Sequence, residues 1–278
     1  METKKKIVNG TLLVLMVILA IAFLAPIFIV LLNSFKGQFF ISDQPFKLPT
    51  AETYAGLKNY INGIRKIGFL QAFGYSSIIT IPSVFVIIIF NSMAAWYITR
   101  VKSATTKIMY FVIIASMIVP FQMVMFTMSK VANVLSLDNP VGIVVLYLGF
   151  GSGLSVFMFS GFVKSIPLEI EESATIDGCN PINLFFKIVF PILKPIAITV
   201  AILNAMWIWN DYLLPYLVIG NTYRTIPIAV QYLQGGYGSK DMGALMAMLI
   251  LAIIPIVIFY ISCQKYIIKG VVAGAVKG

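Results

Sequence analysis

Long apolar stretches alternate with short polar ones along this 278-residue chain. Residues 12–32 form an unbroken apolar run, and a hydrocarbon core about 30 Å thick needs roughly 20 such residues in a helix. We therefore predict an all-α membrane protein in which residues 1–278 form a single transmembrane domain. The six predicted spans cover about residues 11–34, 70–99, 108–130, 139–163, 191–218 and 242–268.

The distribution of Lys and Arg between the predicted loops indicates the orientation of the chain. Twelve of these residues lie on the side of the two termini, and eight lie on the opposite side. Five of the eight belong to one long segment, residues 35–69, where loop length weakens the positive-inside rule. We expect both termini and the loop 164–190 to be cytoplasmic. The first span is too long for a signal-peptide core, so we expect it to remain as a membrane anchor.

Composition excludes several kinds of protein. The net charge is +10, but the positive residues are dispersed around apolar spans, which favours contact with anionic membrane lipid over binding of nucleic acid. The chain has no His. Its two cysteines are isolated thiols without a plausible disulfide partner, Cys179 in the cytoplasmic loop and Cys263 near the inner end of the last span, so we expect no metal site and no disulfide. No GxxxxGKS phosphate loop is present. We expect the chain not to be an enzyme.

The loop 164–190 holds four of the ten acidic residues and has an internal pattern. Ser165 is a possible helix cap, and Pro167 suits the first turn. Three apolar residues at four-residue spacing then give one apolar side: Ile166, Ile170 and Ala174. Gly178 can adopt the left-handed conformation that ends a helix. The first half of the loop therefore predicts one short helix.

A second short helix is predicted after Gly178. Asn180 can cap it, and Pro181 suits its first position. Its apolar face contains Ile182, Phe185, Phe186 and Val189. A helical hairpin lying on the lipid surface is one interpretation, but anionic headgroups would repel an acidic first helix. We favour a docking element that fits a groove on a cytoplasmic protein.

The run Glu172-Ser173-Ala174-Thr175-Ile176-Asp177-Gly178-Cys179 resembles the EAA loop of ATP-binding-cassette importer permeases. Ser173 and Cys179 replace the usual alanines of that motif. In the family, this loop contains the coupling helix, which docks on an ATPase subunit. The resemblance implies that ATPase coupling is carried by Glu171, Glu172, Ser173, Ala174, Asp177, Gly178, Cys179, Phe185 and Pro191.

Two further stretches are similar to the carbohydrate branch of this family, on the side of the maltose transporter. They are Trp209-Asn210-Asp211-Tyr212-Leu213-Leu214-Pro215 and the tail 264–278. The resemblance implies the type I permease fold and a bacterial cell membrane. It also implies a sugar substrate, two cytoplasmic ATPases that hold ATP and Mg, a second permease in a heterodimer, and an extracytoplasmic sugar-binding protein. The chain itself would hold no cofactor.

Polar and aromatic residues near the end of the fifth span are candidates for the substrate pathway. An acidic group inside a span is a functional candidate by default, and sugars bind aromatic faces and groups that hydrogen bond to hydroxyls. These candidates are Trp207, Asn210, Asp211 and Tyr212. The alternative is that the aromatic residues belong to an interface belt and that Asp211 sits at the external water boundary.

Other functions stay open at this point. A permease of the same family could carry a non-sugar solute such as a polyamine or an amino acid. A secondary transporter or channel would work without nucleotide, but the sequence offers no chain of carboxylates for ion coupling and no inverted repeat. A membrane-embedded enzyme or scaffold is the third alternative, and no catalytic cluster can be assembled from the available residues.

Overall fold

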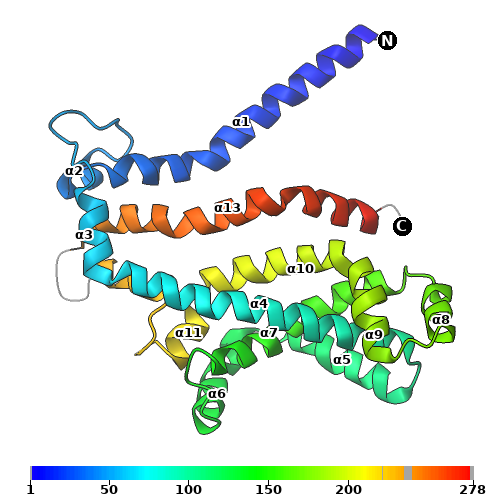
Figure 1. Ribbon diagram of the computed structural model, residues 1–278. Coiled ribbons are helices and arrows are strands. Elements are labelled where there is room, and N and C mark those ends of the chain that lie inside the picture. Colours follow the sequence, from blue (N-terminus) through cyan, green and yellow to red (C-terminus); the bar gives the residue numbers. More distant parts are fainter. Residues whose placement is uncertain (1, 221, 235–239, 276–278) are drawn as a thin grey trace. The chain divides into compact units, whose positions relative to one another are not determined.

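The computed structural model describes residues 2–220, 222–234 and 240–275 (Figure 1), with side chains for residues 9–264 within these ranges. The side chains of the tail residues 265–278 lie outside this description. The chain divides into two compact parts, residues 1–70 with 229–254 and residues 71–228 with 255–278. Each part is described by itself.

Helices account for nearly all the regular structure in the described ranges. They are α1 (Glu2–Ser34), α2 (Gln38–Asp43), α3 (Lys58–Ile67), α4 (Phe69–Arg100), α5 (Ala104–Ile118), α6 (Phe121–Val134), α7 (Gly142–Val163), α8 (Leu168–Ile176), α9 (Pro181–Leu184), the π-helix η1 (Phe185–Val189), α10 (Phe190–Asn210), α11 (Leu213–Val218), α12 (Ile226–Gln231), the 3₁₀ turn η2 (Tyr232–Gln234) and α13 (Met242–Ala275). Five helical segments are long and apolar enough to cross a membrane: 9–34, 69–100, 142–163, 181–210 and 242–264. The chain is therefore an all-α, multi-pass membrane protein.

The predicted span 108–130 is not one straight helix. Helix α5 and helix α6 meet at an angle of 108°, and together they are long and apolar enough for a sixth span. Val119 between them is extended, with φ −77° and ψ 115°. The ring of Pro120 disfavours a helical conformation at the residue before it and removes a backbone donor, so the helix ends at Ile118.

The predicted span 191–218 also contains a break. Helix α10 ends at Asn210, and Asp211 is extended with φ −72° and ψ 122°. A short helix, α11, then begins at Leu213. The break separates the long helix from the last six helical residues of this stretch.

The core of the second part lies between α4, α7 and α10, which run side by side in Figure 1. Ile87 of α4, Tyr147 of α7 and Leu193 of α10 are fully buried there. The loop after α7 packs against the same core through Ile166, Ala174, Leu184 and Phe185. The loop is therefore part of the packed structure.

In the first part, the segment after α1 is held by polar contacts with the backbone. Lys36 is buried, and its Nζ donates to the backbone oxygen of Gln44 at 2.7 Å. Asn59 Nδ2 donates to the backbone oxygens of Ser34 and Lys36, both at 2.8 Å. Burial lowers the pKa of Lys36 from its ordinary value, because the charged form loses contact with water.

Candidate functional site

The loop after α7 folds into the helical hairpin that the sequence predicted. Helix α8 is followed by a turn at Asp177 and Gly178, and α9 begins at Pro181. Gly178 has φ +83°, a conformation that residues with a Cβ rarely adopt. A Cβ placed there would have no atom within 4 Å. The glycine is therefore required by the backbone conformation and not by lack of space.

The caps of the two helices confirm one prediction and correct another. Asn180 Oδ1 accepts a hydrogen bond from the backbone N–H of Asn183 at 2.8 Å, and Pro181 occupies the first turn of α9. Ser165 does not cap α8. Its hydroxyl donates to the backbone oxygen of Phe162 at 2.8 Å, and the N-cap residue is Pro167 with ψ 135°. Proline restricts the residue before it to extended conformations, so α8 starts later than predicted.

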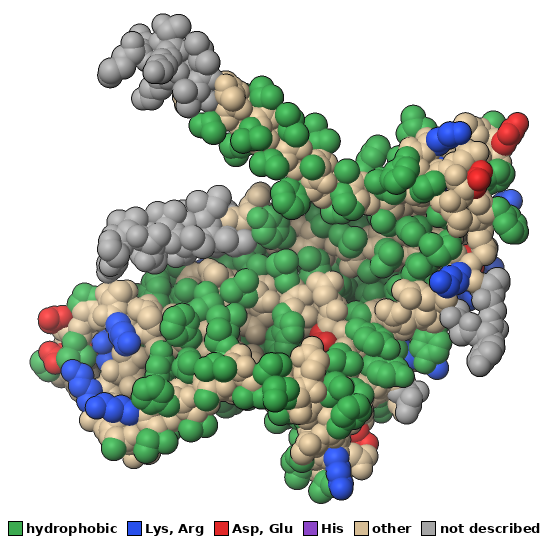
Figure 2. Space-filling view, turned by 180° about the vertical axis from the view of Figure 1, so that it is seen from behind, with side chains coloured by type: hydrophobic (Ala, Val, Ile, Leu, Met, Phe, Trp, Pro, Cys, Tyr) green, Lys and Arg blue, Asp and Glu red, His purple; other side chains and the backbone are tan. Residues whose placement is uncertain are grey.

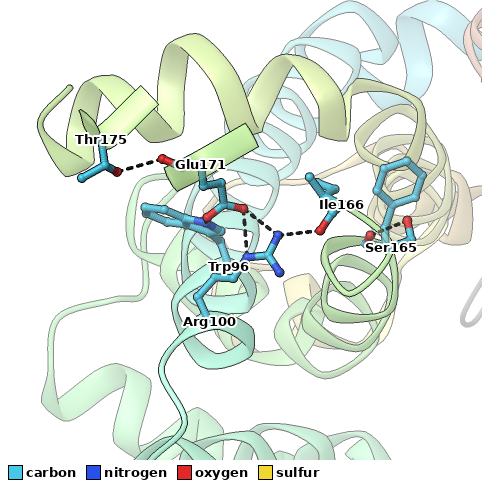
Figure 3. A network of polar contacts seen from close by, with 7 residues as sticks. Trp96, Arg100, Ser165, Ile166, Glu171 and Thr175 are labelled. Atoms are coloured by element: carbon cyan, nitrogen blue, oxygen red, sulfur yellow. Dashed lines mark hydrogen bonds and ion pairs between the residues drawn. The ribbon is translucent and has the colours of Figure 1, made fainter. Parts of the chain in front are cut away.

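Glu171 is buried at the centre of a polar network (Figure 3), with only 6% of its surface exposed. Arg100, the last residue of α4, donates to Oε1 through Nε at 2.8 Å and through Nη2 at 2.6 Å. Trp96, one turn earlier on α4, donates its indole N–H to Oε2 at 2.9 Å. Arg100 Nη2 also donates to the backbone oxygen of Ile166 at 3.0 Å. We call these contacts of Glu171, Arg100, Trp96 and Ile166 the α4–α8 clamp.

The α4–α8 clamp gives Glu171 contacts inside the protein. The family resemblance implies a coupling role for Glu171, and in the structure its side chain points into the protein, where both carboxylate oxygens have partners. Trp96 and Arg100 are functional residues that were not predicted from the sequence pattern. Their spacing of four residues places them on one helix face, and this pairing at the end of an apolar span was the available signal.

The opposite face of α8 is open to solvent. Glu172, Ser173 and Asp177 are exposed there. A shallow depression lies at the side of this face, between α8 and α9, and is lined by Leu168, the buried Glu171, Glu172, Thr175, Ile176 and Leu184. Ile176 is 86% exposed, and Ile182 of α9 is 67% exposed. Large exposed apolar side chains beside exposed carboxylates are suited to a protein partner.

The predicted apolar faces of the two helices are only partly buried. Ile166 and Ala174 are buried, whereas Ile170 is 41% exposed. On the second helix, Phe185 and Val189 are buried, while Ile182 and Phe186 are exposed. The prediction treated each apolar face as a single buried surface, but a helical hairpin on the end of a bundle has only one side covered by the core.

Phe185 joins the hairpin to α4. It is 1% exposed, and its ring centroid lies 5.5 Å from that of Trp96. Phe185 begins the π-helical turn that leads into α10. The exposed Pro191, in the first turn of α10, follows this turn and has no backbone N–H to continue the regular helical pattern. Cys179 is half-buried in the turn between α8 and α9.

The four candidates for the substrate pathway, Trp207, Asn210, Asp211 and Tyr212, lie around the end of α10, and they differ in their contacts and exposure. Trp207 is 41% exposed, and its ring packs edge-to-face on Tyr147 with centroids 5.5 Å apart. Asn210 is exposed, with Nδ2 donating to the backbone oxygen of Met206 at 2.7 Å. Tyr212 stacks on Tyr216 with centroids 5.1 Å apart. Trp207 and Asn210 therefore offer a ring and an amide on one side of the helix end.

Asp211 has structural contacts through both carboxylate oxygens. Its Oδ1 accepts from the backbone N–H groups of Leu213 at 3.0 Å and Leu214 at 3.4 Å. The Tyr147 hydroxyl donates to Oδ2 at 3.1 Å. Asp211 therefore caps α11 and holds the break next to α7. Among the residues that the structure describes, no cluster of three or more Cys, Asp or Glu side chains could hold a metal ion.

Comparisons with known proteins show the family of the chain. The family described as binding-protein-dependent transport system inner membrane component matches residues 87–272. The chain is 38% identical to the probable starch degradation products transport system permease protein AmyC of Thermoanaerobacterium thermosulfurigenes, over 94% of each chain. It is 35% identical to the multiple sugar-binding transport system permease protein MsmG of Streptococcus mutans, over 95% of each chain.

The fold also matches a solved structure. A crystal structure of a bacterial ABC transporter involved in the import of the acidic polysaccharide alginate aligns with a TM-score of 0.79 at 21% identity. The alignment covers 95% of this chain and 98% of the other. The architecture is therefore that of an ABC importer permease, and the chain belongs to the family of inner membrane components of binding-protein-dependent transport systems.

Proposed function

We propose that this chain is one of two permease subunits of an ATP-driven sugar importer, and that it couples to a cytoplasmic ATPase through α8 and α9. The observation that carries this proposal is the α4–α8 clamp. Glu172 and Ile176 offer an exposed surface to a partner, while Glu171 ties the same short helix to the end of α4. A force applied to the outer face of α8 therefore reaches a membrane span directly.

The clamp is suited to transmitting force because it is buried and directional. Arg100 donates twice to Oε1 of Glu171 and Trp96 donates to Oε2, so both oxygens are held and the orientation of the carboxylate is fixed as well as its distance. The rings of Trp96 and Phe185 pack beside it. A helix held only by apolar contacts could slide on such a surface, whereas a shared ion pair resists sliding and rotation.

A sugar is the substrate that best suits the chain. The names of two relatives refer to starch degradation products and to multiple sugars. The end of α10 carries the type of groups that sugars bind, with the half-exposed ring of Trp207 and the exposed amide of Asn210. Tyr212 and Asp211 follow directly, and the capping role of Asp211 would fix the shape of this part of the pathway.

In the proposed cycle, a sugar-loaded binding protein docks on the extracytoplasmic side, which includes residues 35–69. Two ATPases bind ATP with Mg and close on the cytoplasmic side. The α8–α9 hairpin moves with them, and the spans open the pathway outward. This chain then supplies half of the pathway, and the second permease supplies the other half. Both termini are cytoplasmic in this arrangement.

Reconstitution tests the substrate and the assembly together. The chain is purified from its native membranes with its associated proteins, which are identified by mass spectrometry and incorporated into liposomes. We expect ATP-dependent uptake of a labelled oligosaccharide and none of a polyamine or an amino acid. ATP-dependent uptake of the polyamine or the amino acid, without uptake of the oligosaccharide, would show that the substrate is not a sugar. Solute flux through the chain alone would overturn the coupling to an ATPase.

Cross-linking tests the docking surface. In a background with Cys179→Ser and Cys263→Ser, an Ile176→Cys variant should cross-link to the ATPase, because Ile176 is 86% exposed. Ala174→Cys, which lies on the buried face of the same helix, is the matched control and should not cross-link. Equal cross-linking at both positions, or at neither, would contradict the proposed surface.

A further inference from the structure

A basic pocket lies beside the hairpin, between the end of α4, the start of α5 and the end of α7. Its volume is about 550 Å³. Three exposed lysines contribute to its lining, Lys102, Lys107 and Lys164, and no acidic residue does. Blue Lys and Arg side chains gather at the left of Figure 2, with red Asp or Glu side chains at the outer edge beside them and a largely green, hydrophobic surface on the other side. We refer to this cavity as the lysine pocket.

Two residues that line the lysine pocket carry buried hydroxyl groups that lack a partner among the described residues. They belong to Thr99 of α4 and Ser160 of α7, and both residues line the cavity. Ser160 is only 1% exposed. A buried polar group without a hydrogen bond is unfavourable, and a ligand that supplies oxygen atoms would remove this cost.

The loop at the mouth of the pocket is fixed before any ligand arrives. Ser103 Oγ accepts from the backbone N–H of Thr106 at 3.1 Å, and Thr106 Oγ1 accepts from the backbone N–H of Ser103 at 3.1 Å. The Thr106 hydroxyl also donates to the backbone oxygen of Val101 at 2.7 Å. Helix α5 is 15 residues long and starts here at Ala104, so the positive end of its dipole adds to the charge of the lysines.

The order of residues along the helices changes from basic to hydroxylic to apolar. Lys164 follows the last residue of α7, and Ser160 lies one turn further into that helix. On α5, Lys107 is followed one turn later by Tyr110 and Phe111, which also line the pocket. Phe111 is 71% exposed. This sequence of groups corresponds to a phospholipid, with a phosphate outermost, ester oxygens next and an acyl chain deepest.

We propose that the lysine pocket binds the headgroup of an anionic phospholipid. The ammonium groups of Lys102, Lys107 and Lys164 pair with the phosphodiester. The hydroxyls of Thr99 and Ser160 donate to oxygens nearer the glycerol backbone. One acyl chain lies along Tyr110 and Phe111 within the bilayer. A free phosphate would use the lysines but would leave the apolar wall and the deeper hydroxyl of Ser160 without a partner, so a lipid fits the cavity better.

A lipid titration tests this site. The full-length chain in detergent micelles is titrated with phosphatidylglycerol and with phosphatidylcholine that carries the same acyl chains, and bound lipid is counted by native mass spectrometry. We expect phosphatidylglycerol to bind more tightly. Replacing Lys102, Lys107 and Lys164 by Gln should weaken its binding by about fivefold for each lysine removed, since each contributes about 1 kcal/mol near a charged surface.

A second triple variant controls for net charge. Lys47→Gln, Lys58→Gln and Lys130→Gln remove the same charge from exposed positions outside the pocket and should leave phosphatidylglycerol binding unchanged. Equal weakening by both triple variants would overturn a specific site. Equal binding of the two lipids would do the same. Displacement of the lipid by millimolar inorganic phosphate would assign the site to a soluble anion instead.

Ser160→Ala separates ligand binding from folding. The substitution removes a buried hydroxyl without a described partner, so thermal stability of the lipid-free chain should be unchanged or higher. Binding of phosphatidylglycerol should nevertheless weaken by about two- to tenfold, the range for one lost hydrogen bond. Unchanged lipid binding in a folded Ser160→Ala variant would overturn the proposed orientation of the lipid.

Discussion

The end of α4 contributes to two charged sites, and they differ in that the charges of the α4–α8 clamp are paired whereas those of the lysine pocket are not. In the clamp, Arg100 is paired with a carboxylate that is almost completely buried. In the pocket, the neighbouring Thr99 faces a cavity with lysines and no carboxylate. Consecutive residues of one helix thus serve a closed joint and an open site. The paired charges of Arg100 and Glu171 join α4 to α8, whereas the unpaired charges of the lysines are available to a ligand.

Breaking the ion pair should have the largest effect on the molecule. Glu171→Ala leaves Arg100, whose side chain is 18% exposed, without a counter-charge, and loss of one partner of a buried pair costs about 3–5 kcal/mol. We expect a marked fall in the thermal unfolding temperature in detergent and loss of ATP-driven uptake in liposomes. A Glu171→Ala variant with normal stability would show that water or a neighbouring group replaces the carboxylate.

A double substitution distinguishes stability from coupling. Glu171→Leu with Arg100→Met removes both charges and keeps an apolar contact, and such replacements are often neutral or stabilising. Thermal stability should therefore return close to that of the original chain, while uptake stays low because the directional contact is gone. Full recovery of uptake would mean that packing around Phe185 is sufficient to transmit the movement of α8.

Changing the exposed face of α8 should affect coupling without affecting the clamp. Glu172→Lys with Gly178→Val reverses an exposed charge and forces a residue with a Cβ into a conformation with φ +83°. We expect uptake to fall at least about tenfold, the range for a repulsive charge at an interface, while the spans stay folded by circular dichroism. Normal uptake in the double variant would refute the docking assignment.

The features of the site that could be predicted are set by residues close together in the sequence. The features that could not be predicted depend on contacts between residues far apart in the sequence. Gly178, Asn180 and Pro181 define a turn and a cap through residues that are neighbours in the chain, so the hairpin could be predicted. Glu171 and Arg100 are 71 residues apart, and no local pattern shows which of two consecutive glutamates turns inward. The exposed Glu172 carries the family resemblance, whereas the buried Glu171 carries the internal contact.

The two breaks in the spans show the same limit. Pro120 was visible in the sequence, but a proline inside an apolar stretch is compatible with a kinked helix as well as with a bend of 108°. Asp211 attracted attention as an acidic group at membrane depth. Its hydrogen bonds to Leu213 and Leu214 are those of a helix cap, and this signature is local enough to have been recognised.

Removing the indole N–H of Trp96 tests how much of the stability provided by the α4–α8 clamp comes from this uncharged donor. Trp96→Phe keeps an aromatic ring against Phe185 and removes the hydrogen bond to Glu171 Oε2. Because the acceptor is charged, we expect a loss of about 1.5–3 kcal/mol in the free energy of unfolding, less than for Glu171→Ala. A loss as large as that of Glu171→Ala would place the main contribution in the indole instead of in the guanidinium.

Thr99→Val makes the complementary change on the pocket side of the same helix end, and its effect should be the smallest. Valine has nearly the same shape as threonine, and the hydroxyl that it removes is buried without a described partner. In the lipid-free chain we therefore expect a change within about 1 kcal/mol, neutral or stabilising. The thermal unfolding temperature in detergent without added lipid measures this directly, with Trp96→Phe as the matched variant one turn away. A destabilisation as large as that of Trp96→Phe would mean that the Thr99 hydroxyl already has a partner, and the contrast between a closed joint and an open site would then fail at this residue.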